Sequence, residues 1–209
     1  MNTNVLVICG DIWHPAAKVR QGINSLRAFD FNFEFAEGGE MPNRNTIGGF
    51  PIVVLARANV DHQFQPWLTE KSSTDFPEHV RRGNALVVLH GGMARYEHLP
   101  TMNSLFGGSF LHHPKPCAVI LEPTGHSNIT KNLPSFSALD EQYFVDTRSD
   151  VHIFLQSRSQ HGVQPAGWTR EEGKGRVCVL TPGHTSEMWA HPQFQKLLLN
   201  ALQWAVHSR

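Results

Sequence analysis

The sequence has few cysteines, no excess of charge of either sign and no long apolar run. Its 209 residues contain 18 Lys and Arg against 18 Asp and Glu, and like charges nowhere form a run. This balance argues against nucleic acid as a partner and against a basic membrane-binding surface. No apolar segment reaches the length needed to cross a membrane. We therefore expect neither nucleic acid nor a membrane among its partners.

The three cysteines, Cys9, Cys117 and Cys178, form no closely spaced pair. A strand pattern starts already at Asn4, which leaves no room for a signal peptide before it. Proteins without a secretory signal keep their thiols reduced, so we expect free cysteines that pack as small hydrophobic side chains. The expected location is the cytoplasm.

The first half of the chain alternates between strand and helix patterns. Apolar or alternating runs predict strands at 4–11, 31–39, 51–57 and 84–93. Apolar residues at helical spacing follow Pro15 over 16–26, and a second helix pattern covers 75–83. Strands that alternate with helices form crossovers between parallel strands. We therefore predict a parallel sheet with helices on both faces.

After residue 94 the pattern loosens into segments rich in Gly, Pro and polar residues. We predict loops at 106–116 and 124–144 on either side of one strand at 117–122, and another loop at 41–50. Two strands within 165–184 are joined by a turn at Gly173–Gly175, and a helix at 191–206 closes the chain. Neither a repeat nor a linker interrupts the pattern, so we predict one domain, 1–209.

Thirteen histidines are the unusual feature of the composition. In an open parallel sheet, ligands bind beyond the carboxyl ends of the strands. His14 follows the first strand in CGDIWHP, His90 follows the fourth in LHGG, and His184 follows the last in LTPGH. Three strand ends therefore direct an imidazole to the same edge of the sheet, where we expect the rings to meet.

The stretch VVLHGGM (87–93) places His90 on a turn tight enough to need Gly91 and Gly92. A sharp strand-to-helix turn presents a side chain clear of the backbone, and an imidazole is suited to metal binding or proton transfer. The alternative is a core histidine that donates to a backbone carbonyl. Simpler alternatives also exist for His14, which could open a helix, and for His184, which could cap one.

The other histidines and one acidic pair complete the candidates. One of His112 and His113 is expected in solvent, and His191 is expected to open the last helix. Adjacent residues on a strand point to opposite sides, so Asp140 and Glu141 should direct at most one carboxylate to the site. The histidines expected at the surface are His62, His79, His98, His152, His161 and His207.

Five segments spread over nearly the whole chain together resemble a known family. They are LVICGDIWHP, GNALVVLHGGMARY, LFGGSFLHHP, GHSNITKNLPSFSALDEQYF and PAGWTREEGKGRVCVLTPGHTSEMWAHPQF. In combination they resemble the ThuA-like (trehalose utilisation) proteins. The resemblance implies an α/β flavodoxin-like, class I glutamine amidotransferase-like three-layer sandwich with a mostly parallel central sheet. It also implies a role in the metabolism of disaccharides and sugar derivatives, notably trehalose and its keto forms.

The sequence departs from the amidotransferases of this fold at their nucleophile. Those enzymes place a catalytic cysteine after the fourth strand in a pattern such as I-C-x-G-M, whereas this chain has L-H-G-G-M with His90 in that position. Their later H-P-E is also altered, because Glu187 in GHTSE is displaced by one residue. Without a thiolate the covalent acyl intermediate cannot form. We therefore expect no glutaminase activity.

Two enzymatic mechanisms fit these residues. In the first, His90, His184 and one or two of His14, His113 and Glu141 hold zinc or manganese, the metals that imidazole-rich sites favour. The metal would polarise a carbonyl or activate water. In the second, no metal is bound, and His90 and His184 act as acid and base with Glu141 orienting them. We favour the metal, predict no nucleotide cofactor, and expect a hydrolase, lyase or isomerase.

The ligand implied by the resemblance is a small carbohydrate. Aromatic faces can stack on a sugar ring, and acidic, imidazole and backbone groups can bind its hydroxyls. A non-catalytic carbohydrate-binding or regulatory domain is the alternative function, although such a domain has no need for three convergent histidines. We also expect a homo-oligomer, a dimer or larger. The predicted substrate-binding residues are Asp11, Trp13, His14, Gly91, Gly92, Tyr143 and Trp189.

Overall fold

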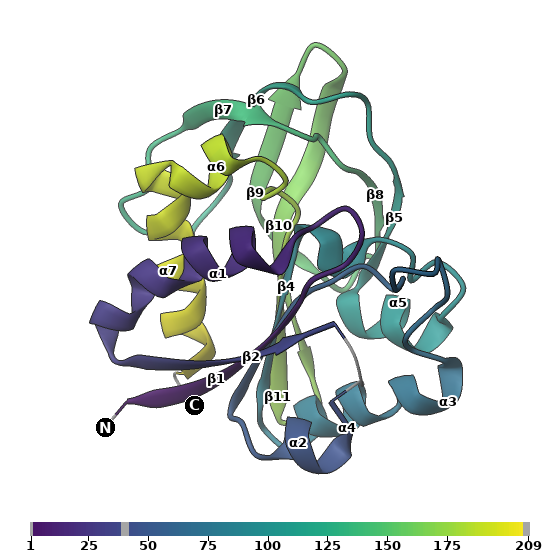
Figure 1. Cartoon of the computed structure of the whole chain (residues 1–209). Coiled ribbons are helices and arrows are strands. Elements are labelled where there is room, and N and C mark those ends of the chain that lie inside the picture. The colour runs from purple at the N-terminus through teal and green to yellow at the C-terminus, as the bar shows by residue number, and fades with distance from the viewer. Residues whose placement is uncertain (1, 39–41, 207–209) are drawn as a thin grey trace.

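A nine-stranded mixed sheet forms the middle of the described part of the chain (Figure 1). The computed structural model describes residues 2–38 and 42–206. From one edge of the sheet to the other, the strands are β2 (Phe31–Glu37), β1 (Thr3–Cys9), β3 (Ile52–Ala56), β4 (Ala85–Leu89), β11 (Gly175–Leu180), β10 (Gly162–Glu172), β9 (His152–Ser159), β6 (Cys117–Pro123) and β7 (Phe136–Asp140).

The first five strands in this order are mutually parallel. Strands β3 and β4 are buried along their whole length, and β1 is buried from Val5 to Cys9. Burial on both faces is the reason that these strands read as continuous apolar runs. The four strands predicted in the first half of the chain are therefore confirmed, together with the parallel order that their crossovers implied.

The other half of the sheet is antiparallel, from β11 through β10, β9 and β6 to β7. The strand predicted at 117–122 and the two predicted within 165–184 are confirmed as β6, β10 and β11, whereas β7 lies in a segment predicted as a loop and β9 was not predicted. A separate antiparallel pair joins β5 (Gly108–His112), inside the loop predicted at 106–116, to β8 (Phe144–Thr147), which starts at the last residue of the loop predicted at 124–144. Strand β7 alternates between buried and exposed residues, as a strand with one solvated face does. Its Gly- and Pro-rich flanks concealed that short alternation, so the loop prediction was wrong there.

The loop predicted at 41–50 was also wrong in part; its first residue lies outside the described ranges. Residues Arg44–Gly48 form a short helix, α2. The side chain of Asn43 accepts hydrogen bonds from the backbone N–H groups of Asn45 and Thr46. Such a side-chain cap satisfies the free donors of the first turn, which is enough to start a helix in a polar segment.

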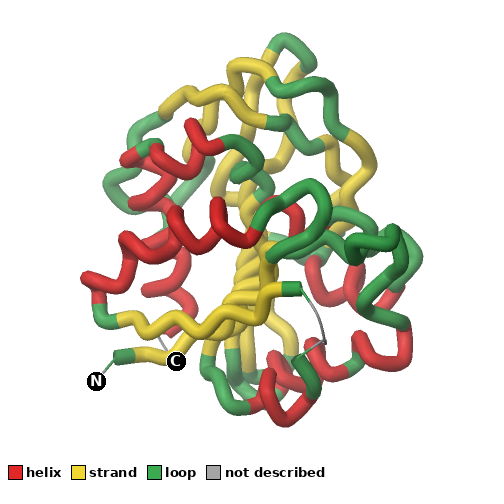
Figure 2. Tube along the Cα trace, in the orientation of Figure 1, coloured by secondary structure: helices red, strands yellow, loops and turns green. Residues whose placement is uncertain are grey.

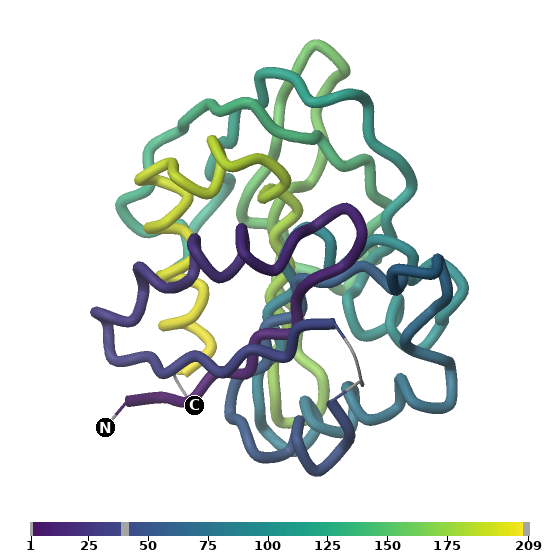
Figure 3. The backbone as a smooth tube through the Cα atoms, in the orientation of Figure 1, coloured from purple at the N-terminus to yellow at the C-terminus, as the bar shows by residue number. Residues whose placement is uncertain are grey.

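Helices cover both faces of the sheet and complete a three-layer arrangement (Figure 2). On one face lie α1 (Ala16–Asn24), the short 3₁₀ helix η1 (Ser25–Phe29), α6 (Ser186–Ala190) and α7 (Pro192–Val206). On the other lie α2, α3 (Glu70–Ser73), α4 (Asp75–Arg81) and α5 (Pro100–Phe106). The chain trace brings α1 beside α6, although most of the sequence separates them (Figure 3).

The three cysteines are free, as expected. Cys9 and Cys178 are buried and Cys117 is half-buried. Burial raises the pKa of the Cys9 thiol to about 12, so this group is not a reactive thiolate at neutral pH. Among the described residues, no helix combines the length and apolar character that a membrane crossing requires.

Candidate metal centre

The turn after β4 exists because two glycines permit it. His90 opens a short 3₁₀ helix, η2 (His90–Met93), at a φ of 40°. A Cβ at Gly92 would lie 2.0 Å from the carbonyl oxygen of Leu55, and a Cβ at Gly91 would lie 2.6 Å from Nδ1 of His14. Gly92 therefore lets the turn approach strand β3, and Gly91 makes room for the ring of His14.

His90 is buried, with each ring nitrogen in a different environment. Nδ1 lies 2.7 Å from the carbonyl oxygen of Thr181. Because a carbonyl can only accept, Nδ1 carries the hydrogen and Nε2 of the neutral ring keeps its lone pair. The hydroxyl of Tyr143 lies 3.1 Å from that Nε2 and donates to it. Burial lowers the pKa of His90 to about 4, reinforced by His14 and opposed by Glu141.

Asp11 fixes the orientation of the His14 ring. Nδ1 of His14 lies 2.9 Å from both carboxylate oxygens of Asp11. The same carboxylate accepts backbone N–H groups of Trp13, His14 and Ala58 at 2.7–3.0 Å. Burial alone would raise the pKa of Asp11, but these bonds lower it below its ordinary value. The carboxylate therefore keeps the hydrogen on Nδ1 and leaves Nε2 free to bind a ligand.

The loop after β11 carries His184 and is held by a buried carboxylate. Asp140 accepts the backbone N–H groups of Gly183, His184 and Thr185 at 2.8–3.0 Å. Lys18 donates to the carbonyl oxygen of His184 at 2.7 Å. The Nδ1 atom of His184 is buried and has no hydrogen-bond partner. Burial, with a contribution from the nearby His90, lowers the pKa of this ring to about 4.

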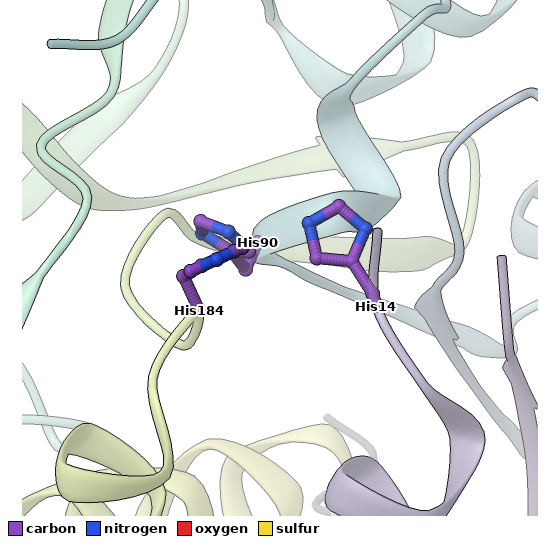
Figure 4. Close-up of side chains that lie close together, drawn as sticks. All are labelled: His14, His90 and His184. Carbon is purple, nitrogen blue, oxygen red and sulfur yellow. The ribbon is translucent and has the colours of Figure 1, made fainter. Parts of the chain in front are cut away.

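The three imidazoles meet at the carboxyl edge of the parallel strands (Figure 4). One nitrogen from each of His14, His90 and His184 lies within 4.8 Å of the other two. The ring centroids are 5.0 Å apart for His14 and His90, 5.5 Å for His14 and His184, and 5.3 Å for His90 and His184. The low pKa of His90 and of His184 keeps both rings neutral, the form that binds a metal.

Glu141, the residue after strand β7, joins this cluster. One carboxylate oxygen lies 3.4 Å from Nε2 of His90 and 3.4 Å from Nδ1 of His184. The other oxygen lies 3.4 Å from Nδ1 of His113. Asp140 faces the 183–185 backbone instead, as alternation along a strand requires. Burial opposes ionisation of Glu141, but the surrounding imidazoles outweigh it and lower its pKa.

His113 lies beside Glu141 and outside the three-histidine cluster. Its Nδ1 is 2.9 Å from the carbonyl oxygen of Pro114, and 38% of its side chain is exposed. The neighbouring His112 stacks on Phe144, with ring centroids 4.6 Å apart. His113 is therefore the member of the pair that faces the site. Its contact is with the carboxylate of Glu141.

The comparisons with known proteins agree with this architecture. The family model ThuA, described as trehalose utilisation, matches residues 4–205. The chain belongs to the ThuA family. This confirms the resemblance found in the sequence.

Solved structures share the fold of this ThuA-family chain. A ThuA-like protein from Bacteroides uniformis ATCC 8492 is 20% identical, with a TM-score of 0.78 over 98% of this chain and 91% of that one. A ThuA-like protein from Parabacteroides merdae ATCC 43184 is 18% identical, with a TM-score of 0.78 over 98% and 90%. A β-galactosidase from Bacillus circulans sp. alkalophilus is 10% identical, with a TM-score of 0.65 over 97% of this chain and 31% of that one. No curated protein sequence matches the chain.

Several residues predicted for the site of this ThuA-family protein have other positions. Trp189 is only 5% exposed. It packs between Gly22 and Phe194 and donates to the carbonyl oxygen of Gly183 at 2.7 Å. Its ring therefore supports the loop before His184 and offers no face to a ligand. The carboxylate of Asp11 is likewise hydrogen-bonded to His14 and to backbone N–H groups, so it is not free to bind a sugar hydroxyl. Trp13, in contrast, is 42% exposed.

Two further positions show what the sequence did not reveal. Asp140 anchors the His184 loop, a role visible only once β7 and the end of β11 are adjacent. His79, expected at the surface, is buried, and its Nδ1 lies 3.4 Å from the side-chain amide of Asn84. His207 lies outside the described residues. The other histidines expected at the surface are exposed: His62, His98, His152 and His161.

Proposed function

We propose that this ThuA-family protein is a metal-dependent enzyme of sugar metabolism on a flavodoxin-like, glutamine amidotransferase-like scaffold. Its substrate would be a disaccharide or a keto-sugar derivative related to trehalose. The family description supports the substrate class. The observation that carries the metal chemistry is the convergence of His14, His90 and His184, whose ligand nitrogens lie within 4.8 Å of one another.

The donors fit zinc or manganese on three grounds. Nδ1 of His14 and Nδ1 of His90 both face oxygen acceptors, so each ring keeps its lone pair on Nε2. The Nε2 of His90 accepts the hydroxyl of Tyr143, a hydrogen bond that a bound metal would replace. The buried Nδ1 of His184 makes no hydrogen bond and has only a 3.4 Å contact with the carboxylate of Glu141, so a ligand there would satisfy a buried polar group. The Asp11–His14 pair has the carboxylate–histidine form that orients metal ligands. Three histidines would leave a further position open to water or substrate.

The surrounding side chains would then move protons. When bound, the metal would polarise a substrate oxygen or lower the pKa of water to about 7. The carboxylate of Glu141, ionised at neutral pH and adjacent to two of the three imidazoles, is the group that would accept a proton from water or a sugar hydroxyl. The hydroxyl of Tyr143 would donate a hydrogen bond in the same space. We propose a hydrolase, lyase or isomerase reaction of this kind.

The experiment that tests the metal is elemental analysis of purified protein, with His14→Ala and His184→Ala as variants. We expect about one zinc or manganese per wild-type chain and little in either variant, because each loses one of three ligands. The control is His98→Ala, which removes an exposed histidine and should leave the metal content unchanged. Metal-free wild-type protein with full turnover in the presence of a chelator would refute the metal and favour acid–base chemistry by His90, His184 and Glu141.

A second measurement separates enzyme from binding module. The wild-type protein is incubated with trehalose and with its keto forms, and the products are followed by chromatography before and after chelation. Turnover that disappears with the metal and returns when it is added supports the proposal. Binding of these sugars with no turnover under any metal condition would support the alternative, a carbohydrate-binding or regulatory domain.

A further inference from the structure

Two large aromatic side chains are exposed on the rim that carries the histidines. Trp13 lies in the loop after β1 and is 42% exposed, and Phe64 lies in the loop after β3 and is 64% exposed. Strands β1 and β3 are neighbours in the sheet, so the two loops are adjacent. The rings meet edge to face, with centroids 6.3 Å apart and planes at 71°.

The turn that carries Phe64 is built to hold its ring outward. Phe64 has a φ of 60°, a conformation that is strained for a bulky side chain. The carboxylate of Asp61 accepts the backbone N–H groups of Gln63 and Gln65 at 2.7 and 2.9 Å, and these two bonds lower its pKa. The backbone N–H of Asp61 donates to the carbonyl oxygen of Gln65 at 2.8 Å, which closes the turn. Strain and exposed apolar area both oppose folding, so this geometry points to a ligand.

Packed side chains lead from Ile12, the residue before Trp13, to the metal centre. Ile12, next to Trp13, packs on a small apolar cluster that also contacts Phe110. The ring of Phe110 lies 4.5 Å from that of Tyr143, which in turn donates to His90. The other members of the cluster are Ala58, Val60 and Ala94. Trp13 and His14 are consecutive, so their Cα atoms are about 3.8 Å apart.

We infer that Trp13 and Phe64 form a second sugar subsite, which makes the substrate a disaccharide rather than a single sugar. This inference rests on the proposed function. One ring of the substrate would lie at the histidines, and the apolar face of the other would stack on the aromatic pair. Aromatic side chains suit such a position because their rings are rigid and apolar. A cleft of about 550 Å³, within the usual range for small ligands, lies beside the same two loops; Asp11, Ile12 and His62 line it, and the two rings stand next to it.

The test uses Phe64→Gly, which removes the ring without a strained backbone. Glycine adopts a φ of 60° freely, so this variant should fold at least as well as the wild type. The probes are trehalose and glucose, titrated calorimetrically into zinc- or manganese-loaded protein. We expect the affinity for trehalose to fall three- to tenfold relative to that for glucose, the range expected for one aromatic contact. Phe64→Tyr keeps the ring and should retain the wild-type ratio.

The matched control is Phe29→Ala, which removes an exposed aromatic ring just before β2. Phe29 lies at the amino ends of the parallel strands, whereas Trp13 and Phe64 lie beyond their carboxyl ends. It should leave the trehalose-to-glucose ratio unchanged. If Phe64→Gly weakens both sugars equally or neither, the subsite is refuted while the proposed function stands. If the metal-loaded wild type binds neither sugar, the proposed substrate class fails and the subsite fails with it.

Discussion

Replacing Asp11 with asparagine separates the charge of this side chain from its shape. In the wild type, one carboxylate oxygen accepts from Trp13 and His14 and the other from Ala58, while Nδ1 of His14 is 2.9 Å from both. An asparagine amide can present oxygen on one side only. Its NH₂ group then faces either the backbone N–H of Ala58 or the backbone N–H groups of Trp13 and His14, so at least one donor in this buried cradle loses its acceptor.

The loss acts on both metal binding and stability. In either orientation the NH₂ lies as close to Nδ1 of His14 as the amide oxygen does. When the NH₂ donates to Nδ1, the hydrogen of the ring moves to Nε2, the atom proposed to bind the metal. Removing an orienting partner of a metal-bound histidine costs about 10- to 100-fold in affinity, or roughly 1–3 kcal/mol. An unsatisfied buried donor costs a further 1–3 kcal/mol or so in folding stability. We therefore expect weaker metal binding in a protein that still folds.

The assay is competition for zinc against a chromophoric chelator, with urea denaturation in parallel. The control is Asp61→Asn, the same substitution in a carboxylate that also accepts backbone N–H groups but contacts no imidazole in its turn. Its metal affinity should equal that of the wild type. A metal affinity within twofold of wild type for Asp11→Asn would show that the charge of Asp11 does not orient His14, and the proposed role would be wrong.

Two further predictions concern stability. Burial, with Arg82 nearby, lowers the pKa of His79 to about 4 from an ordinary value of 6.5, so the unfolded chain binds more protons between these values and stability falls as the pH drops. Between pH 7.5 and pH 5, this residue should lower the free energy of unfolding by roughly 2 kcal/mol. In urea titrations at both pH values, His79→Gln should lose less stability than the wild type. An equal loss would contradict the assignment. Gly92→Ala would place a Cβ 2.0 Å from the Leu55 carbonyl and should destabilise by more than about 2 kcal/mol. Gly48→Ala, which meets nothing within 4 Å, should be close to neutral in the same thermal denaturation, and equal melting temperatures for the two variants would refute the steric argument.

The parallel half of the sheet and the meeting of the histidines were predictable from local pattern. Strands buried on both faces must be apolar throughout, so β1, β3 and β4 stand out in the sequence. Parallel strands share one carboxyl edge, so residues that follow them are brought together whatever their separation along the chain. His14, His90 and His184 follow three such strands, which is why their convergence could be expected before any coordinates.

The antiparallel half was less predictable. Strands β6, β10 and β11 were predicted, but β9 was not, and the alternation of β7 spans only five residues within a segment rich in Gly, Pro and polar residues. The roles of individual side chains also depended on distant partners. The carboxylate of Asp11 accepts a hydrogen bond from the backbone N–H of Ala58, 47 residues away. The carboxylate of Asp140 accepts from backbone N–H groups 43 to 45 residues away.

Local periodicity and residue type thus determined the parallel strands, the tight turn at His90 and the edge at which imidazoles gather. Only the tertiary structure decided that Trp189 is internal while Trp13 is exposed, that Glu141 and not Asp140 faces the histidines, and that His113 contacts the carboxylate of Glu141. The physical reason is that strand and turn patterns arise from neighbouring residues, whereas burial and hydrogen-bond partners depend on segments that meet only when the sheet has formed.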